Sequence, residues 1–149
     1  VELLNHINFI SRYIELPKKL TVKQNLEVYG RLYDVRKLKE KIEYLSEKLR
    51  LNEFLNKITG ELSSGQKNRV SLAKSIINDP TVLLLDEPTA SLDPETGDFV
   101  RSFLENYQKE NGVSILIASH NMTEVERLCS SVFMMNKGAI IEKIWKKFF

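Results

Sequence analysis

Residues 81–87 read Thr81-Val82-Leu83-Leu84-Leu85-Asp86-Glu87, and they predict a buried strand that ends in two carboxylates. Its apolar run is continuous rather than alternating, which is typical of a strand that is covered on both faces. Open α/β sheets bind ligands beyond the carboxyl ends of their strands, where the two carboxylates would stand. An acidic loop after a core strand explains the pattern equally well. Asp86 and Glu87 are therefore either structural or part of a ligand site.

The residues on both sides of this stretch alternate between helical and strand patterns. The expected elements are a strand at 7–10, helices at 22–33, 35–49 and 62–78, the strand at 81–86, a helix at 94–110, a strand at 113–119, a helix at 122–129 and a hairpin at 132–142. The first two helices form a small helical unit. The later alternation predicts an α/β fold with a mostly parallel sheet and helices over its faces.

Length and composition narrow the class of protein. A chain of 149 residues is one domain or a piece of one. Its 22 basic and 20 acidic residues give a net charge of +2, so no nucleic acid partner is expected. The single cysteine excludes a disulfide within the chain. The apolar runs are too short for a bilayer and the first residues carry no secretory signal, so we expect a soluble, intracellular protein.

Two further polar segments are candidates for phosphate chemistry. Residues Ser63-Ser64-Gly65-Gln66 open a predicted helix, where unpaired backbone N–H groups and the helix dipole favour an anion. A polar N-cap and turn accounts for the same residues. His120 follows the strand at 113–119 and should emerge beside Asp86 and Glu87, where an imidazole could hydrogen-bond a terminal phosphate. An ordinary surface histidine is the alternative.

In combination, these segments resemble the ATPase cassette of ABC transporters in order and in spacing. Leu62–Gln66 is similar to the family's signature sequence, Val82–Glu87 to its Walker B strand, Ser91-Leu92-Asp93 to its D-loop and His120 to its switch histidine. The resemblance implies a partial P-loop NTPase core over residues 1–149. Within it, residues from about 20 to 60 would form the helical subdomain, and residues from about 61 to 149 the signature helix and the C-terminal part of the core.

The resemblance also implies a set of roles. In the family, ATP and Mg²⁺ lie between two cassettes that pair head to tail. Asp86 would hold Mg²⁺, Glu87 would activate the hydrolytic water, and His120 would contact the γ-phosphate. The signature residues Ser63, Ser64, Gly65 and Gln66 would bind the nucleotide of the partner cassette, and Asp93 would couple the two sites. The other partner would be a transmembrane transporter subunit, which places the protein on the cytoplasmic, inner face of the membrane.

The sequence departs from the family pattern at several places. No Gly-x-x-x-x-Gly-Lys-Ser/Thr P-loop occurs in the 149 residues, Arg12 stands near the position of the Q-loop glutamine, and Ser64 replaces a signature glycine. We therefore expect a fragment truncated at both ends. It should hydrolyse little or no ATP alone, and it should leave a sheet edge and apolar faces uncovered, which lowers its solubility.

Three functions fit the resemblance. The leading one is the ATP-hydrolysing subunit of a transporter, and residues 16–26 look most like exporters of the ABC-2 type. A soluble cassette protein that acts on ribosomes or nucleic acid is the second. A nucleotide-binding regulator without hydrolysis is the third; the presence of both Glu87 and His120 argues against it.

Overall fold

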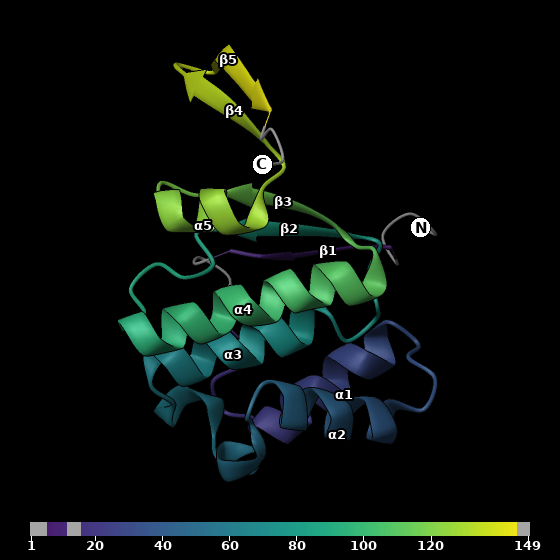
Figure 1. The fold of residues 1–149 in the computed structure, drawn as a ribbon. Helices are drawn as coiled ribbons and strands as arrows, with labels where there is room; N and C mark the ends of the chain where they lie inside the picture. The colour runs from purple at the N-terminus through teal and green to yellow at the C-terminus, as the bar shows by residue number, and fades with distance from the viewer. Residues whose placement is uncertain (1–5, 12–15, 146–149) are drawn as a thin grey trace.

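A computed structural model describes residues 6–11 and 16–145 (Figure 1). The strands are β1 (Ile7–Ile10), β2 (Val82–Asp86), β3 (Ser114–Ala118), β4 (Ser131–Asn136) and β5 (Ala139–Trp145). The α-helices are α1 (Val22–Leu32), α2 (Leu38–Lys48), α3 (Ser64–Ser75), α4 (Pro94–Asn111) and α5 (Met122–Leu128). Short 3₁₀ turns η2 (Asn52–Phe54) and η3 (Thr59–Glu61) lie between α2 and α3.

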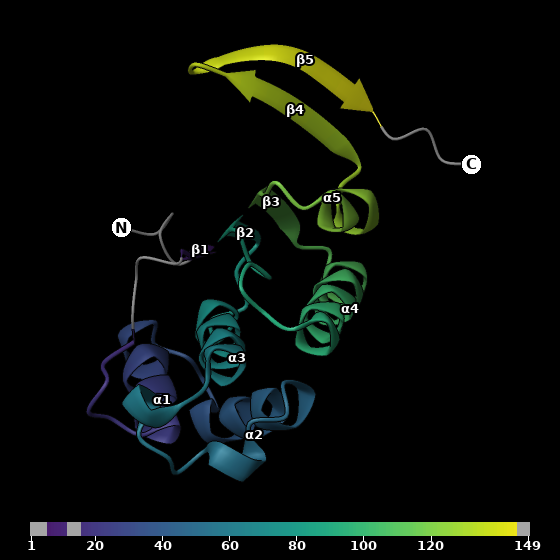
Figure 2. The ribbon, with the colours of Figure 1, turned by 90° about the vertical axis from the view of Figure 1, so that its left-hand side faces the viewer.

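The central sheet is parallel, with strand order β1-β2-β3. Helices α3 and α4 run side by side beneath one of its faces, and α5 lies next to β3 (Figures 1 and 2). Leu83 and Leu85 point from β2 into the buried core, where Val100 and Leu104 of α4 also lie. The α/β class and the parallel sheet that the sequence predicts are confirmed.

The opposite face of the sheet differs from the prediction. Phe9, Leu84 and Leu116 lie on neighbouring strands in one register row, because Phe9 pairs with Leu84 and Leu84 with Leu116. Their exposed fractions are 42%, 36% and 63%. The prediction that β2 is covered on both faces is therefore wrong for the described residues, which cover only one. The expected uncovered apolar face is confirmed.

The helical unit is built from α1 and α2, which lie below α3 in Figure 1. Thr21 caps α1 through a reciprocal capping box with Gln24. The second helix starts at Leu38 rather than at the predicted Val35, because Lys37 has a left-handed backbone with a φ of 54° and ends any continuous helix there. Likewise α3 ends at Ser75, three residues before the predicted Asn78.

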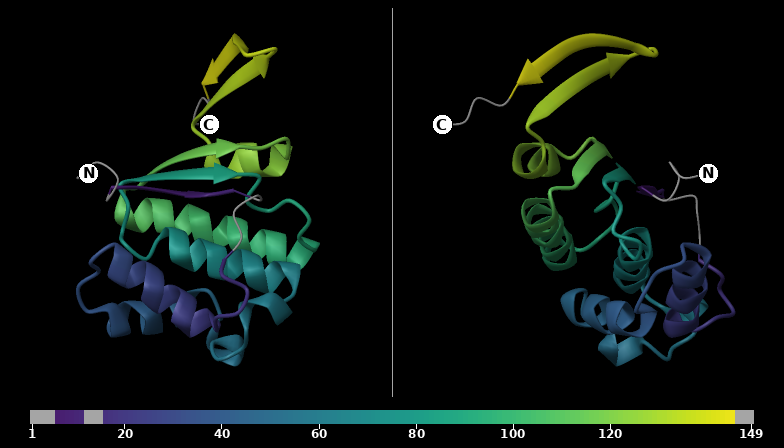
Figure 3. Two further views of the ribbon diagram at one scale, coloured as in Figure 1. Left: turned by 180° about the vertical axis from the view of Figure 1, so that it is seen from behind. Right: turned by 90° about the vertical axis from the view of Figure 1, so that its right-hand side faces the viewer.

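Strands β4 and β5 form a separate antiparallel hairpin, as the sequence predicts. The hairpin arches away from the parallel sheet (Figure 3). Its turn uses Gly138 at a φ of 81°, a conformation that glycine adopts without strain. Across residues 6–11 and 16–145, no helix combines the length and the hydrophobicity that a membrane crossing requires.

Candidate functional site

The carboxyl ends of the three parallel strands bring the predicted acidic pair and the histidine to one rim. Asp86 is the last residue of β2 and lies opposite Ala118, the last residue of β3. The backbone N–H of Glu87 donates to the carbonyl oxygen of Ala118 at 2.8 Å, which ties the two strand ends together. Because His120 follows β3 by two residues, it emerges next to Glu87.

Glu87 and His120 are in direct contact. Glu87 Oε1 lies 2.6 Å from His120 Nδ1 and also accepts the backbone N–H of His120 at 3.2 Å. Glu87 has a left-handed backbone, with a φ of 50°, which is rare outside glycine. The side chain of His120 is 82% exposed, whereas that of Glu87 is 21% exposed. The largely buried carboxylate of Glu87 is therefore in contact with the solvent-accessible imidazole of His120.

Asp86 has a different partner. The hydroxyl of Ser11, the residue after β1, donates to Asp86 Oδ2 at 3.3 Å. The rim therefore collects groups from all three parallel strands. Ser11 lies beside the position expected for the Q-loop glutamine, but its contact with Asp86, 75 residues away, was not predicted. Arg12, the residue expected at the Q-loop position, lies outside the described residues.

The donor set at this rim suits Mg²⁺. Within the described ranges no group of three or more His, Cys, Asp or Glu side chains could enclose a metal. Mg²⁺ needs no such group, since it keeps several waters and takes one or two carboxylates together with substrate phosphates. Asp86, with the Ser11 hydroxyl beside it, offers this kind of partial ligation.

The predicted signature turn is a helix N-terminus with a capping box. Ser63 Oγ accepts the N–H of Gln66 at 3.3 Å, and Gln66 Oε1 accepts the N–H of Ser63 at 3.0 Å. The polar N-cap, one of the two interpretations of these residues, is thus present, and the phosphate site stays a prediction. Ser63 and Ser64 are exposed. Gly65 permits a close helix approach, because a Cβ there would stand 3.2 Å from Thr96 Cγ2 of α4.

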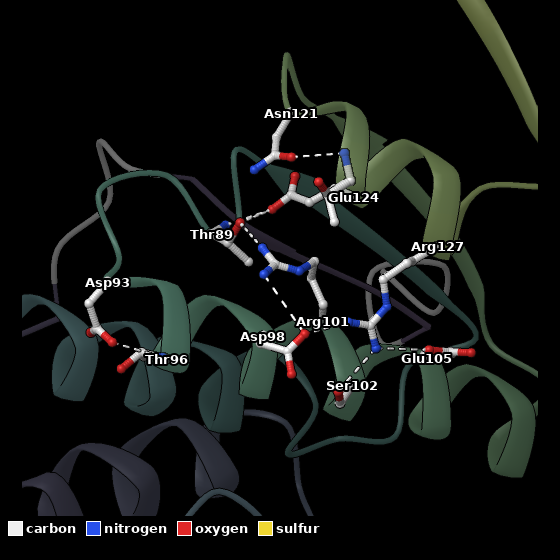
Figure 4. A network of polar contacts seen from close by, with 11 residues as sticks. Thr89, Asp93, Thr96, Asp98, Arg101, Ser102, Glu105, Asn121, Glu124 and Arg127 are labelled. Atoms are coloured by element: carbon white, nitrogen blue, oxygen red, sulfur yellow. Dashed lines mark hydrogen bonds and ion pairs between the residues drawn. The ribbon is translucent and has the colours of Figure 1, made fainter.

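Asp93 caps the neighbouring helix α4. Its side chain accepts the N–H of Thr96 at 3.0 Å (Figure 4), and this hydrogen bond lowers the pKa of the Asp93 carboxyl. Asp93 is exposed, and Thr96 lies against Gly65. The signature turn and the D-loop residue therefore sit at the same end of two adjacent helices.

A cavity of about 250 Å³ lies between α3 and the rim. Ser11, Ser64, Asp86 and Glu87 are among its lining residues. Pockets that bury a drug-sized ligand usually measure about 300–1,000 Å³, so this cavity is too small to enclose a nucleotide. A nucleotide at the rim would need further groups to hold it.

Two hydrogen bonds on the turn after Glu87 were not predicted. Asn68 Nδ2 of α3 donates to the carbonyl oxygen of Pro88 at 2.7 Å. Glu124 Oε1 of α5 accepts the N–H of Thr89 at 3.1 Å. Neither partner stands near the turn in the sequence, and no local pattern marks it. Periodicity could have shown only that Glu124 falls on the inner side of a short helix.

Fold and rim together define an ATP-binding cassette core. The sequence model of the ABC transporter family matches residues 2–90, and the chain belongs to this family. It is similar to the methionine import ATP-binding protein MetN 1 of Bacillus cereus, with 40% identity over 140 residues that cover 91% of this chain and 40% of the relative. It is also similar to the Nod factor export ATP-binding protein I of a Rhizobium species, with 37% identity over 134 residues that cover 89% and 44%.

The chain thus spans less than half the length of these two curated relatives. Among solved structures, a dimeric ATP-binding cassette bound to ADP and Pi has a TM-score of 0.85 over 96% of this chain and 64% of that one. Its sequence identity is 23%, so this likeness supports the fold alone. The family membership and the cassette fold that the motifs predict are confirmed.

Proposed function

We propose that the protein is the ATP-binding and ATP-hydrolysing subunit of an ABC transporter, in which pairing of two cassettes around ATP energises transport. The observation that supports this proposal is the direct Glu87–His120 contact beside Asp86 at one sheet rim. A regulator that does not hydrolyse ATP has no use for such a carboxylate–imidazole pair.

Asp86 is the residue that would hold Mg²⁺, with the Ser11 hydroxyl as its neighbour. Bound Mg²⁺ neutralises charge on the phosphate oxygens during transfer. The hydrogen bond from Ser11 orients one carboxylate oxygen of Asp86, and the other oxygen would be available to Mg²⁺.

In this proposal Glu87 acts on the attacking water and His120 acts on the γ-phosphate. The Glu87 carboxylate orients the attacking water and accepts its proton, as a general base does. His120 turns Nδ1 toward Glu87, so its Nε2 is the nitrogen that meets the γ-phosphate. Hydrolysis then proceeds by positioning and charge neutralisation, with no covalent intermediate on the protein.

The signature turn acts on the nucleotide of the partner cassette. Ser63 and Ser64 are exposed at the start of α3, where the helix dipole and backbone N–H groups favour phosphate. Gly65 and Gln66 complete this turn, and the adjacent Asp93 couples it to the second site.

The membrane partner is a transmembrane transporter subunit, which the helical unit of α1 and α2 contacts from the inner face of the membrane. The ABC-2 exporter type is the narrower hypothesis, based on residues 16–26. The relatives include one named for import and one named for export, so they favour neither direction. They give no support to a role on ribosomes.

ATP hydrolysis by the protein expressed from its complete gene tests the proposal. Glu87→Gln removes the base and keeps the shape, so we expect kcat to fall by about 10²–10⁴-fold. Glu110→Gln, an exposed change on α4, is the matched control and should leave the rate unchanged. Equal rates in both variants would refute the assignment of Glu87. The 149 residues alone should show little or no hydrolysis, because they contain no P-loop.

A further inference from the structure

Glu87 is the first residue of a tight turn that ends at Ala90. Glu87 has a left-handed backbone, and the N–H of Ala90 donates to the carbonyl oxygen of Glu87 at 3.2 Å to close the turn. A non-glycine residue in this conformation is strained, so the surrounding contacts must hold it. Thr89, inside the turn, is only 6% exposed.

Glu124 provides the contact that holds Thr89. It belongs to the first turn of α5 and is 1% exposed. Its Oε1 accepts both the backbone N–H of Thr89, at 3.1 Å, and the hydroxyl of Thr89 (Figure 4). Arg101 of α4 donates from Nη1 to the same hydroxyl at 3.4 Å, which brings a positive charge toward the buried carboxylate.

A reciprocal arrangement links this contact to the rim. The carboxylate of Glu87 accepts the backbone N–H of His120, and the carboxylate of Glu124 accepts the backbone N–H of Thr89. Two short segments, 87–89 and 120–124, are therefore joined at both ends. The second segment is itself fixed, because Asn121 Oδ1 caps α5 through the N–H of Thr123 at 2.9 Å.

Burying the Glu124 carboxylate costs free energy, which suggests that its hydrogen bonds serve a specific geometry. A buried carboxylate needs hydrogen bonds to offset its lost hydration, and an apolar side chain of similar volume would fill the same space without that penalty. Among the described residues, Glu124 Oε2 has no hydrogen-bond partner. All of the side-chain hydrogen bonds of Glu124 that the structure describes thus go to Thr89, at the turn beside Glu87.

We propose that Glu124 is a positioning residue, which holds the Thr89 turn and thereby keeps Glu87 and His120 aligned for ATP hydrolysis. This inference rests on the proposed function of the rim. Glu124 touches neither nucleotide nor water in this role, and it acts only through the backbone and hydroxyl of Thr89.

Two substitutions of Glu124 separate the effect of side-chain length from the effect of charge. Glu124→Gln loses the charge but keeps an oxygen at the same distance, so it should still accept the Thr89 N–H and keep most of the activity. Glu124→Asp keeps the charge but withdraws the carboxylate by one methylene. A misplacement of about 1 Å at the reacting groups can lower a rate by about 10²-fold, so we expect Asp to lower kcat by about 10–100-fold. The KM for ATP should stay unchanged, since the residue does not bind ATP.

The assay uses the protein expressed from its complete gene, with Glu110→Asp as the control on an exposed surface. Circular dichroism checks that each variant is folded. The proposal is overturned if the Asp variant is fully active, or if the Gln variant is impaired while the Asp variant is not, because charge rather than position would then matter. A Glu124→Asp variant whose kcat/KM falls only because KM rises, with kcat unchanged, would also contradict the proposal.

Amide hydrogen exchange gives a readout that does not require hydrolysis. In Glu124→Asp, exchange should become faster at Thr89 and also at His120, whose N–H bonds to Glu87 and not to Glu124. Faster exchange at Thr89 alone would show a purely local role and reject the proposal. If the wild-type protein hydrolyses no ATP, the proposed function fails, and the exchange at His120 still decides whether Glu124 positions the rim.

Discussion

Asn68→Ala tests whether the signature helix is physically tied to the turn after the acidic pair. Asn68 lies in the second turn of α3, and its side-chain amide donates to the carbonyl oxygen of Pro88 at 2.7 Å. Pro88 is buried, so alanine at position 68 leaves that carbonyl without its donor. We expect the variant to be less stable and to hydrolyse ATP more slowly.

The size of the stability change follows from two opposing effects. A buried carbonyl that loses its partner destabilises the fold by about 1–3 kcal/mol. Alanine is a better helix former than asparagine, which returns about 0.5 kcal/mol. The free energy of unfolding should therefore fall by about 0.5–2.5 kcal/mol.

Urea unfolding measures this change, and Asn106→Ala on α4 is the matched control because Asn106 is an exposed helical asparagine. Both variants gain the same helix propensity, so the difference between them isolates the hydrogen bond. With a slope of about 2 kcal/mol per molar urea, the midpoints of the two variants should differ by about 1 M. Equal midpoints would refute the link between α3 and the turn.

Three further substitutions test the packing and the charges around the site. Gly65→Val should destabilise the protein by about 1–3 kcal/mol, because its side chain meets Thr96, where even a Cβ would stand at 3.2 Å; an unchanged melting temperature would contradict this close approach. Asp93 has a lowered pKa, so its contribution to stability is present above the ordinary pKa of about 3.9 and is lost as the pH falls. Asp93→Asn keeps a capping oxygen and should flatten that acid limb of the stability curve, whereas an unaltered limb would argue against the cap. Burial lowers the pKa of Lys74, whose ammonium lies 5.2 Å from the ring of Phe9, so stability should rise as the pH approaches the ordinary value of about 10.4. Lys74→Met should remove that rise, and identical alkaline slopes in the two proteins would contradict the assignment.

The sequence was sufficient to predict the elements with strong periodicity. Apolar runs located β2 and β3, and the helical repeat located α4 almost to the residue, because Asp93 and Gly112 mark its two ends. The start of α2 was missed, since nothing in the local sequence shows that Lys37 adopts a left-handed backbone. The run around Leu84 indicated a strand but not its exposure, which depends on what packs against the sheet.

For the site, the sequence was sufficient to predict which residues lie near one another but not the contacts that hold them. The topology of a parallel sheet places strand ends on one rim, so the neighbourhood of Asp86, Glu87 and His120 follows from the order of the strands. The contacts that fix these groups were not predictable. Ser11 meets Asp86 across 75 residues and Glu124 meets Thr89 across 35, and both contacts arise only when distant elements pack.

We propose that the signature turn of one protomer and the acidic pair of the other act on a single ATP. Heterodimers of two variants test this pairing. Ser64→Asp suits the exposed start of α3 but repels phosphate, and Glu87→Gln disables the base. Purified heterodimers of these two single variants contain one intact composite site if the sites are shared, whereas purified heterodimers of the wild type and the double variant contain none. Two different affinity tags separate the heterodimers from the wild-type homodimers, which are active by themselves. We predict that the first heterodimer hydrolyses ATP and the second does not; hydrolysis by the second heterodimer alone would show that each protomer hydrolyses ATP with its own signature turn.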